Sequence, residues 1–228
     1  MTRRVVVSLS GGMDSTAVLA EALDRGYDVL AVGFTYGSKH NTYENAAAIN
    51  VAEHYNVPFT LIPLTAVARH LKSNLLIDGG DIPEGHYEEE TMSQTVVPGR
   101  NMIFASILAG IAWSNDADSV WMGVHSGDHA IYPDCRPDFV DAMNEAMQLG
   151  TDERIHLETP FLHANKTSVI DGCDRYNVPW HLTRTCYKDQ PIACGKCGSC
   201  QERLEAFAAN SIEDPIGYET REIMQKGS

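Results

Sequence analysis

The sequence predicts an α/β protein built on a doubly wound parallel sheet. Short apolar runs rich in β-branched residues alternate with segments that have helical periodicity. A glycine-rich turn follows the first of these runs, which is where such sheets bind ligands, at the carboxyl ends of their strands. With 228 residues, of which 43% are hydrophobic, the chain is long enough for one such domain and a small C-terminal appendage.

The first strand and helix are predicted at residues 4–9 and 14–25. Val5, Val6 and Val7 form an apolar run typical of a buried parallel strand, and Gly26 is a helix stop signal. The same alternation continues along the chain. It predicts strands at 28–34, 59–63 and 119–124, and helices at 43–55, 66–71 and 101–115.

Residues 73–98 interrupt this alternation. They contain Gly79-Gly80, prolines and an acidic run from Glu88 to Glu90. A loop of this length inside a compact domain is usually a lid or a partner surface, and a disordered insertion is the alternative. We therefore expect a nucleotide-binding α/β domain over residues 1–180 with this insertion, followed by a metal-binding segment with a C-terminal helix over residues 181–228.

The turn after the first strand has the features of a phosphate cradle. Adjacent glycines allow a tight turn close to a ligand, and the first N–H groups of the following helix attract anions. Hydroxyl side chains around the glycines add further donors. The candidate nucleotide-binding residues are Ser8, Leu9, Ser10, Gly11, Gly12, Met13, Asp14, Ser15, Thr16, Ala17 and Val18.

The spacing of this turn distinguishes it from other phosphate-binding motifs. A Walker A loop needs Gly-Lys-Ser/Thr after its glycines, and a dinucleotide fold needs Gly-x-Gly-x-x-Gly. The pattern Ser-Gly-Gly-x-Asp-Ser instead resembles the PP-loop of the ATP pyrophosphatases. The resemblance implies that ATP, accompanied by Mg²⁺, is split into AMP and pyrophosphate. Asp14 is expected to cap the helix or to bind magnesium.

Four of the six cysteines cluster near the C-terminus. Cys194, Cys197 and Cys200 are separated by two-residue gaps, and Cys186 is placed to complete a tetrahedral set of thiolates. A closed set of four thiolates predicts structural zinc without an open position for chemistry. An iron–sulfur cluster and a disulfide network stay open as alternatives.

The composition favours small-molecule substrates. The net charge is −14 and lysines and arginines are scattered, so we expect no direct binding of long nucleic acids. No apolar segment has the length of a membrane span, and the first strand begins too early for a leader, which predicts a cytoplasmic protein. The long insertion is a candidate interface for a homodimer.

Further polar segments lie where the predicted fold places the ends of its strands. They are residues 34–40, 97–101, 123–136 and 158–160, together with Lys166. Combined with the glycine turn and the cysteines, they resemble the 7-cyano-7-deazaguanine synthase family of queuosine precursor biosynthesis, over nearly the whole chain. This resemblance implies a fold like that of the adenine nucleotide alpha hydrolases. It also implies that 7-carboxy-7-deazaguanine, ammonia and ATP give the nitrile, AMP and pyrophosphate through adenylated intermediates.

The resemblance also implies roles for particular residues. Arg100 and Lys166 are expected to neutralise phosphate charge, and His125 is expected to move protons during the attack of ammonia. Carboxylates and an arginine are expected to recognise the deazaguanine ring and its carboxylate. The candidate catalytic residues are Asp14, Arg100, Lys166, His125 and Asp128, and the candidate substrate-binding residues are Tyr36, Asp128, Asp134 and Arg136.

Three alternatives remain at this stage. A tRNA thiolase built on a PP-loop would use the cysteines for sulfur chemistry, but the chain lacks a basic surface for RNA. A related enzyme would stop at the amide or attach the deazaguanine to a macromolecule. A nucleotide-sensing module without turnover would need fewer polar loops than this sequence has.

Overall fold

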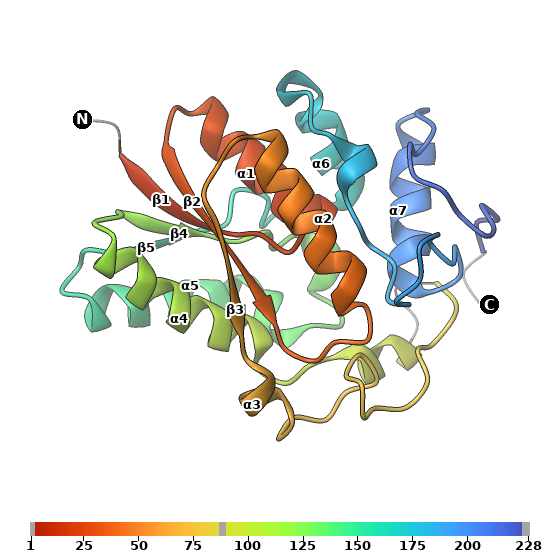
Figure 1. Ribbon diagram of the computed structural model, residues 1–228, viewed down its shortest axis with the longest axis horizontal. Coiled ribbons are helices and arrows are strands. Elements are labelled where there is room, and N and C mark those ends of the chain that lie inside the picture. The colour runs from red at the N-terminus through yellow and green to blue at the C-terminus, as the bar shows by residue number, and fades with distance from the viewer. Residues whose placement is uncertain (1–2, 87–89, 225–228) are drawn as a thin grey trace.

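A computed structural model describes residues 3–86 and 90–224. All of the pairings in its five-stranded sheet are parallel, in the order β3-β2-β1-β4-β5 (Figure 1). The fold class predicted from the sequence is confirmed. The strands are β1 (Arg4–Ser8), β2 (Asp28–Thr35), β3 (Phe59–Pro63), β4 (Ser119–Trp121) and β5 (His156–Glu158).

Helices cover both faces of this sheet, with α1 and α2 on one side and α4 and α5 on the other (Figure 1). Val5 and Val7 pack with the α1 and α2 layer, whereas Val6 packs with the α4 and α5 layer. Successive side chains of a strand point to opposite faces, so the run of valines fills both layers. The helices are α1 (Met13–Asp24), α2 (Asn41–His54), α3 (Thr65–Ala68), α4 (Arg100–Ser114), α5 (Pro137–Gly150), α6 (Lys166–Gly172) and α7 (Gly198–Ala209).

The middle of the chain contains elements that the sequence analysis did not predict. These are α5, β5 and α6. The strand β5 has three residues and α6 has seven, too few for a periodic pattern to stand out. The helix α5 carried a usable signal, because Pro137 begins it and its buried residues Val140, Met143 and Met147 follow helical spacing.

The inserted segment 73–98 is folded in its described part. Leu75 and Met92 are completely buried, and the hydroxyls of Thr95 and Tyr132 lie 2.8 Å apart. A disordered insertion is therefore wrong for the residues described. The acidic run from Glu88 to Glu90 lies outside the described residues, apart from the backbone of Glu90, which begins the 3₁₀ helix Glu90–Thr95.

The C-terminal segment shares core packing with the rest of the protein. Its helix α7 packs against α6, and Phe207 clusters with Met13 and Ile170. Arg203 has no exposed surface and donates two hydrogen bonds to Asp214, at 2.7 and 2.8 Å. A buried pair of this geometry is costly to break, so it fixes α7 relative to the chain that follows it.

One stretch, Thr91–Ser114, is long and apolar enough to cross a membrane by length and composition. In the structure this stretch is a 3₁₀ helix followed by α4, with Pro98 and Gly99 between them. The helix α4 packs against β1 and β4. The sheet therefore covers one face of α4, whose buried residues are Ala105, Leu108, Ala109 and Ala112.

Candidate active site

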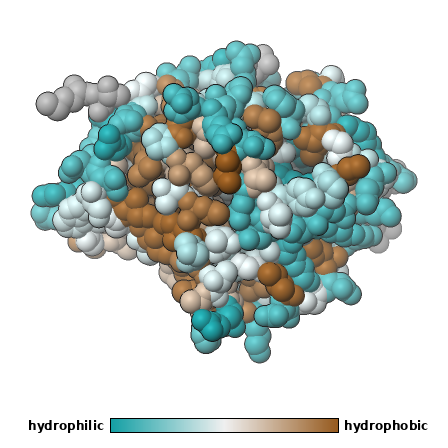
Figure 2. Space-filling view, in the orientation of Figure 1, coloured by the Kyte–Doolittle hydropathy of each residue, from teal (hydrophilic) through white to brown (hydrophobic). Residues whose placement is uncertain are grey.

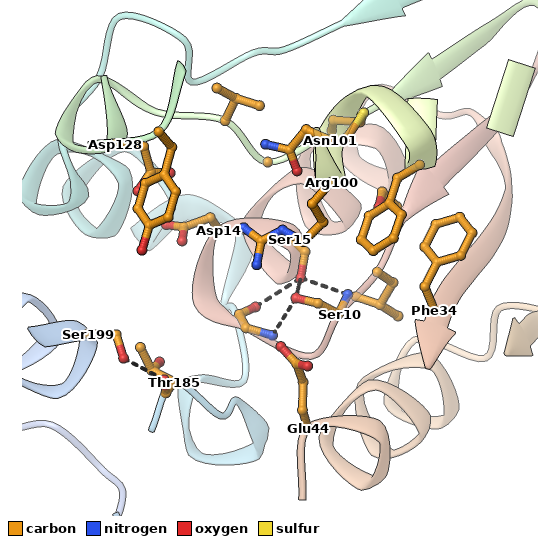
Figure 3. Close-up of a pocket in the computed structure, with 18 of the residues that line it drawn as sticks. Ser10, Asp14, Ser15, Phe34, Glu44, Arg100, Asn101, Asp128, Thr185 and Ser199 are labelled. Atoms are coloured by element: carbon orange, nitrogen blue, oxygen red, sulfur yellow. Dashed lines mark hydrogen bonds between the residues drawn. The ribbon is translucent and has the colours of Figure 1, made fainter. Parts of the chain in front are cut away.

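A cavity of about 200 Å³ opens at the carboxyl ends of β1, β2 and β4 (Figure 3). In the order of the sheet, the chain runs from β1 outward to β3 on one side and continues through β4 and β5 on the other. The cavity therefore lies at the point where the strand order reverses, the position at which open α/β sheets bind ligands. Side chains from α1, α2, α4, α6 and α7 complete its walls.

The glycine loop forms one wall of this cavity and is held in place by its own hydroxyls. Ser10 Oγ lies 3.1 Å from Ser15 Oγ and accepts a hydrogen bond from the Gly12 N–H, at 3.2 Å. Ser15 Oγ in turn accepts the Ser10 N–H at 3.2 Å (Figure 3). These bonds hold a sharp turn at the start of α1, where N–H groups and the helix dipole favour a phosphate.

Glycine is required at one position of the loop. Gly11 has φ +84°, and a Cβ there would lie 2.4 Å from the Ala48 backbone nitrogen in α2. Its carbonyl accepts a hydrogen bond from the Arg184 N–H at 2.8 Å. The loop is therefore clamped between α2 and the chain that leads to the cysteines, and a side chain at this position would push them apart.

The candidate nucleotide-binding residues fall into two groups. Ser8, Leu9, Ser10, Gly12, Asp14 and Ser15 line the cavity. Within the described structure, Gly11, Met13, Thr16, Ala17 and Val18 are buried and do not line it. Thr16 Oγ1, for example, donates to the Gly12 carbonyl at 2.7 Å. The buried residues support the loop from behind.

Asp14 belongs to a charged cluster at one end of the cavity. Lys166 Nζ lies 3.4 Å from Asp14 Oδ2 and 2.5 Å from Glu202 Oε2. Gly12 is the N-cap residue of α1, so the expectation that Asp14 caps this helix is wrong: the carboxylate is used in the pair with Lys166. Magnesium binding by Asp14 stays a prediction.

Burial and charge oppose each other within this cluster. Burial alone raises the pKa of Asp14, but the nearby Lys166 and His125 outweigh it, so the pKa of Asp14 is lowered. For Lys166 burial lowers the pKa, whereas the carboxylates of Asp14 and Glu202 raise it well above the ordinary value. Lys166 therefore carries a full positive charge in a cavity that holds a phosphate cradle.

His125 lies behind this cluster and is 1% exposed. Its Nε2 is 3.5 Å from Asp128 Oδ2 and 3.7 Å from Asp14 Oδ2, and its Nδ1 accepts the Gly127 N–H at 3.1 Å. Burial lowers the pKa of His125, but the surrounding carboxylates outweigh it and the pKa is raised. Asp128 lines the cavity, whereas His125 is not among the described residues that do so.

Arg100 and Tyr36 lie far apart in the sequence but meet at the cavity wall. Arg100 follows Gly99, whose left-handed backbone begins α4, and its guanidinium donates to the Tyr36 hydroxyl at 3.4 Å. Beside them the rings of Phe34 and Phe104 are stacked with centroids 4.1 Å apart. A cation next to flat apolar surface suits a ligand with an aromatic ring and an anionic group.

Two candidate substrate-binding residues are not brought to the cavity. Asp134 is buried, and its Oδ2 accepts the Asn101 N–H at 2.8 Å, which satisfies a free donor in the first turn of α4. Arg136 is exposed and donates to the His129 carbonyl at 2.9 Å. The sequence located their segment correctly, but local turns direct these two side chains elsewhere.

Several lining residues were not singled out from the sequence. The helix α7 contributes Glu202, and the chain around Cys186 contributes Thr185 and Tyr187. His40 and Glu44, from the start of α2, line the cavity as well. The signal for His40 was present, because it lies in a polar segment after β2, whereas nothing local indicated that a residue beyond the cysteines would reach this cavity.

The four clustered cysteines form a compact and fully buried set. Their sulfurs lie within 4.8 Å of one another, and none of these four residues is more than 1% exposed. Backbone N–H groups donate to the sulfurs, for example Cys194 N–H to Cys186 Sγ at 3.3 Å and Cys197 N–H to Cys194 Sγ at 3.3 Å. Such N–H···S bonds stabilise thiolates, so this cluster is suited to hold one metal ion.

Comparison with known proteins identifies the family. The family model for the queuosine biosynthesis protein QueC matches residues 4–211. The chain belongs to this family. A 7-cyano-7-deazaguanine synthase of Pseudoalteromonas translucida is 44% identical, covering 96% of this chain and 100% of the relative. A 7-cyano-7-deazaguanine synthase 1 of Colwellia psychrerythraea is 46% identical over the same shares of both chains.

A solved structure supports the fold. A 4-thiouridine synthetase in complex with RNA and ATP matches with a TM-score of 0.51 at 18% identity, covering 95% of this chain and 47% of that one. The α/β architecture of this chain is therefore shared with that protein.

Proposed function

We propose that this protein is an ATP-dependent synthase that converts 7-carboxy-7-deazaguanine and ammonia into 7-cyano-7-deazaguanine. The observation that carries the proposal is the meeting of the glycine loop, Lys166 and Arg100 in one cavity. Relatives that are named 7-cyano-7-deazaguanine synthase match the chain over almost all of its length. The product is a precursor in queuosine biosynthesis.

The chemistry needs two activations of the same carbon. A carboxylate oxygen attacks the α-phosphorus of ATP, pyrophosphate leaves, and an acyl adenylate forms. Ammonia adds to the acyl carbon. The bond from this carbon to the adenylate oxygen then breaks, and AMP leaves with the bonding electrons, which gives the amide. A second ATP adenylates the amide oxygen. That oxygen then departs with AMP, and the nitrogen loses its two protons to form the nitrile.

The main physical obstacle is the approach of a carboxylate to a triphosphate. In this proposal the N–H groups of the glycine loop, with Ser10 and Ser15, hold the departing pyrophosphate. Lys166 and Arg100 neutralise charge as it develops, and they are already oriented before substrate binds. Tyr36 and Asp128 remain as substrate-binding residues on the wall, while Asp134 and Arg136 have no direct role.

Two metals belong to the proposal. Magnesium enters with the triphosphate, because phosphate oxygens are its usual ligands. Zinc would be held by Cys186, Cys194, Cys197 and Cys200, whose buried sulfurs fit a closed tetrahedral site. With all four positions filled by thiolates, this zinc supplies structural stability and no water for hydrolysis.

The remaining expectations concern partners and location. We propose a homodimer that covers the apolar patch visible over β3 and α4 (Figure 2). Exposed apolar residues in this region include Met102, at 49%, and Trp113, at 40%. The net charge of −14 supports small-molecule substrates without direct binding of long nucleic acids. A cytoplasmic location stays part of the proposal.

The test is mass spectrometry of the products after incubation with 7-carboxy-7-deazaguanine, ATP, magnesium and ammonium. The expected result is the nitrile, with AMP and pyrophosphate formed in step. Accumulation of the amide would limit the protein to the first half of the reaction. Binding of ATP without release of AMP would contradict the proposal.

A further inference from the structure

The guanidinium of Arg100 is a cation on the cavity wall that has no carboxylate partner among the described residues. Its Nη1 donates to the Tyr36 hydroxyl at 3.4 Å. Its Nε and Nη2 have no hydrogen-bond partner in the described structure, and neither atom is fully buried. Arg100 lines the cavity, and Figure 3 shows its side chain reaching into it from the start of α4. One edge of this guanidinium is therefore open to a ligand.

Lys166, the other lysine or arginine among the described lining residues, is already paired. Its Nζ lies 3.4 Å from Asp14 Oδ2 and 2.5 Å from Glu202 Oε2. The described wall also carries four carboxylates, which repel an anionic ligand. They belong to Asp14, Glu44, Asp128 and Glu202. An anionic substrate is therefore held best at Arg100, where no carboxylate has compensated the positive charge.

The open edge of Arg100 has the shape of a carboxylate-binding fork. Nε and Nη2 lie on the same side of the planar guanidinium, so their N–H groups point in the same direction. The two oxygens of a carboxylate each accept one of these hydrogen bonds. Each oxygen keeps a second lone pair, so an oxygen that the fork holds can still attack a phosphorus atom.

A flat apolar surface adjoins this fork. Phe104 lies one helical turn after Arg100 in α4, on the same face of the helix. Its ring is stacked on Phe34 with centroids 4.1 Å apart, and the Tyr36 ring meets it edge-on at 5.6 Å. All three rings line the cavity. In 7-carboxy-7-deazaguanine the carboxylate is attached directly to a flat ring, whereas in ATP a ribose separates the phosphates from the adenine. The arrangement therefore fits the carboxylate substrate.

We propose that the Nε–Nη2 edge of Arg100 binds the carboxylate of 7-carboxy-7-deazaguanine and directs one of its oxygens at the α-phosphorus of ATP. The inference rests on the proposed function and names the residue that selects the acidic substrate. The oxygen forms a bond to phosphorus, the bond from phosphorus to the pyrophosphate oxygen breaks, and pyrophosphate leaves with the electron pair. The carboxylate loses its charge in this step, so the fork holds the acid and not the amide that follows.

The two halves of the reaction distinguish the carboxylate from the triphosphate, because both halves use ATP but only the first uses a charged partner. Exchange of labelled pyrophosphate into ATP, driven by 7-carboxy-7-deazaguanine, measures the first half. Release of AMP during conversion of 7-amido-7-deazaguanine, the neutral amide, into the nitrile measures the second.

The variant Arg100→Gln removes the charge and the fork. Its kcat/KM for the carboxylate substrate should fall by about 10²-fold, mainly through KM, because a charged hydrogen-bonded pair is lost. The conversion of the amide and the KM for ATP should stay within about threefold of wild type, since neither depends on the carboxylate. Retained conversion of the amide also shows that the variant is folded.

The variant Arg100→Lys keeps the charge and removes the fork. It should recover part of the loss but stay about tenfold below wild type with the carboxylate substrate, because an ammonium group lacks the bidentate geometry. The matched control is Arg154→Gln, an exposed arginine between α5 and β5, which should leave both halves unchanged.

An equal loss of both halves in Arg100→Gln would overturn the proposal, because it would place Arg100 on the triphosphate that both halves need. Unchanged use of the carboxylate substrate by this variant would overturn it as well. Full activity of Arg100→Lys would show that no fork is required and would also contradict it. Wild-type protein that converts neither the acid nor the amide would instead remove the proposed function itself, and with it this binding site.

Discussion

The glycine loop and the four-cysteine segment lie far apart in the chain and line the same cavity, but they contribute in different ways. The loop presents backbone N–H groups from a contiguous motif that is held by its own serines. The cysteine segment presents side chains, including Thr185, Ser199 and Glu202, from positions next to its cysteines. Ser199 Oγ donates to the Thr185 carbonyl at 2.8 Å and joins the two halves of that segment (Figure 3).

This comparison shows how one cavity combines two kinds of support. The loop needs few partners beyond its own turn, because main-chain geometry makes the anion site. The side chains of the cysteine segment come from positions beside the four clustered cysteines and from α7, so their placement depends on how that cluster and that helix fold. The pair between Lys166 and Glu202 is the direct link between the metal-binding segment and the charged end of the cavity.

Replacement of Lys166 by alanine should have the largest effect on activity. The loss of a preorganised cation at developing phosphate charge should lower kcat by about 10²- to 10³-fold. Pyrophosphate exchange measures this step. The exposed Lys72, changed to alanine, serves as the control. An activity loss that follows a matching loss of thermal stability would instead assign Lys166 a structural role.

Substitution of Cys197 by serine should test the dependence on the metal cluster. Cys197 supplies one of the four clustered sulfurs and immediately precedes α7, so the variant should lose its metal and, with it, the support of the helix that carries Glu202. Metal content by elemental analysis and protection of α7 in hydrogen exchange are the measurements. Unchanged protection in the sheet is the expected internal control. A variant that retains one metal ion per chain would contradict the ligand assignment.

Replacement of Glu202 by glutamine should weaken its contact with Lys166 and leave the metal bound. Lys166 would keep Asp14 but lose its closer partner, and we expect kcat to fall by about tenfold, with less effect on the KM for ATP. The control is Glu205→Gln in the same helix, whose carboxylate contacts His86. Equal kinetics for the two variants would show that the link does not position Lys166.

A fall in pH should produce the smallest of these effects, a loss of folding stability. The folded-state pKa of Asp14 is lowered, so its contribution to stability is present above the pKa of the unfolded chain and is lost as pH falls through the folded-state pKa. Wild type should therefore lose more stability than Asp14→Asn between neutral and strongly acidic pH. Thermal melting against pH measures the difference, and parallel curves would contradict the expected ion pair.

The sequence predicted the local features of this site well. The strand, glycine turn and helix of the first unit were found within one residue of their expected ends, and the cysteines came together as their spacing indicated. Lys166 and Arg100 line the cavity together with the glycine loop, and their role toward phosphate stays a prediction. The roles of Asp134 and Arg136 were less predictable, because a turn of a few residues decides where each side chain points.

By itself, the sequence determined the fold class, the phosphate-binding turn, the cysteine set and the family. Each of these depends on patterns of neighbouring residues, because main-chain hydrogen bonding and short-range spacing define them. Only the tertiary structure decided that Glu202 reaches Lys166, that His125 lies behind the wall and that His40 with Glu44 lies on it. These contacts follow from the order of the strands and from long-range packing between helices, which short-range patterns do not encode.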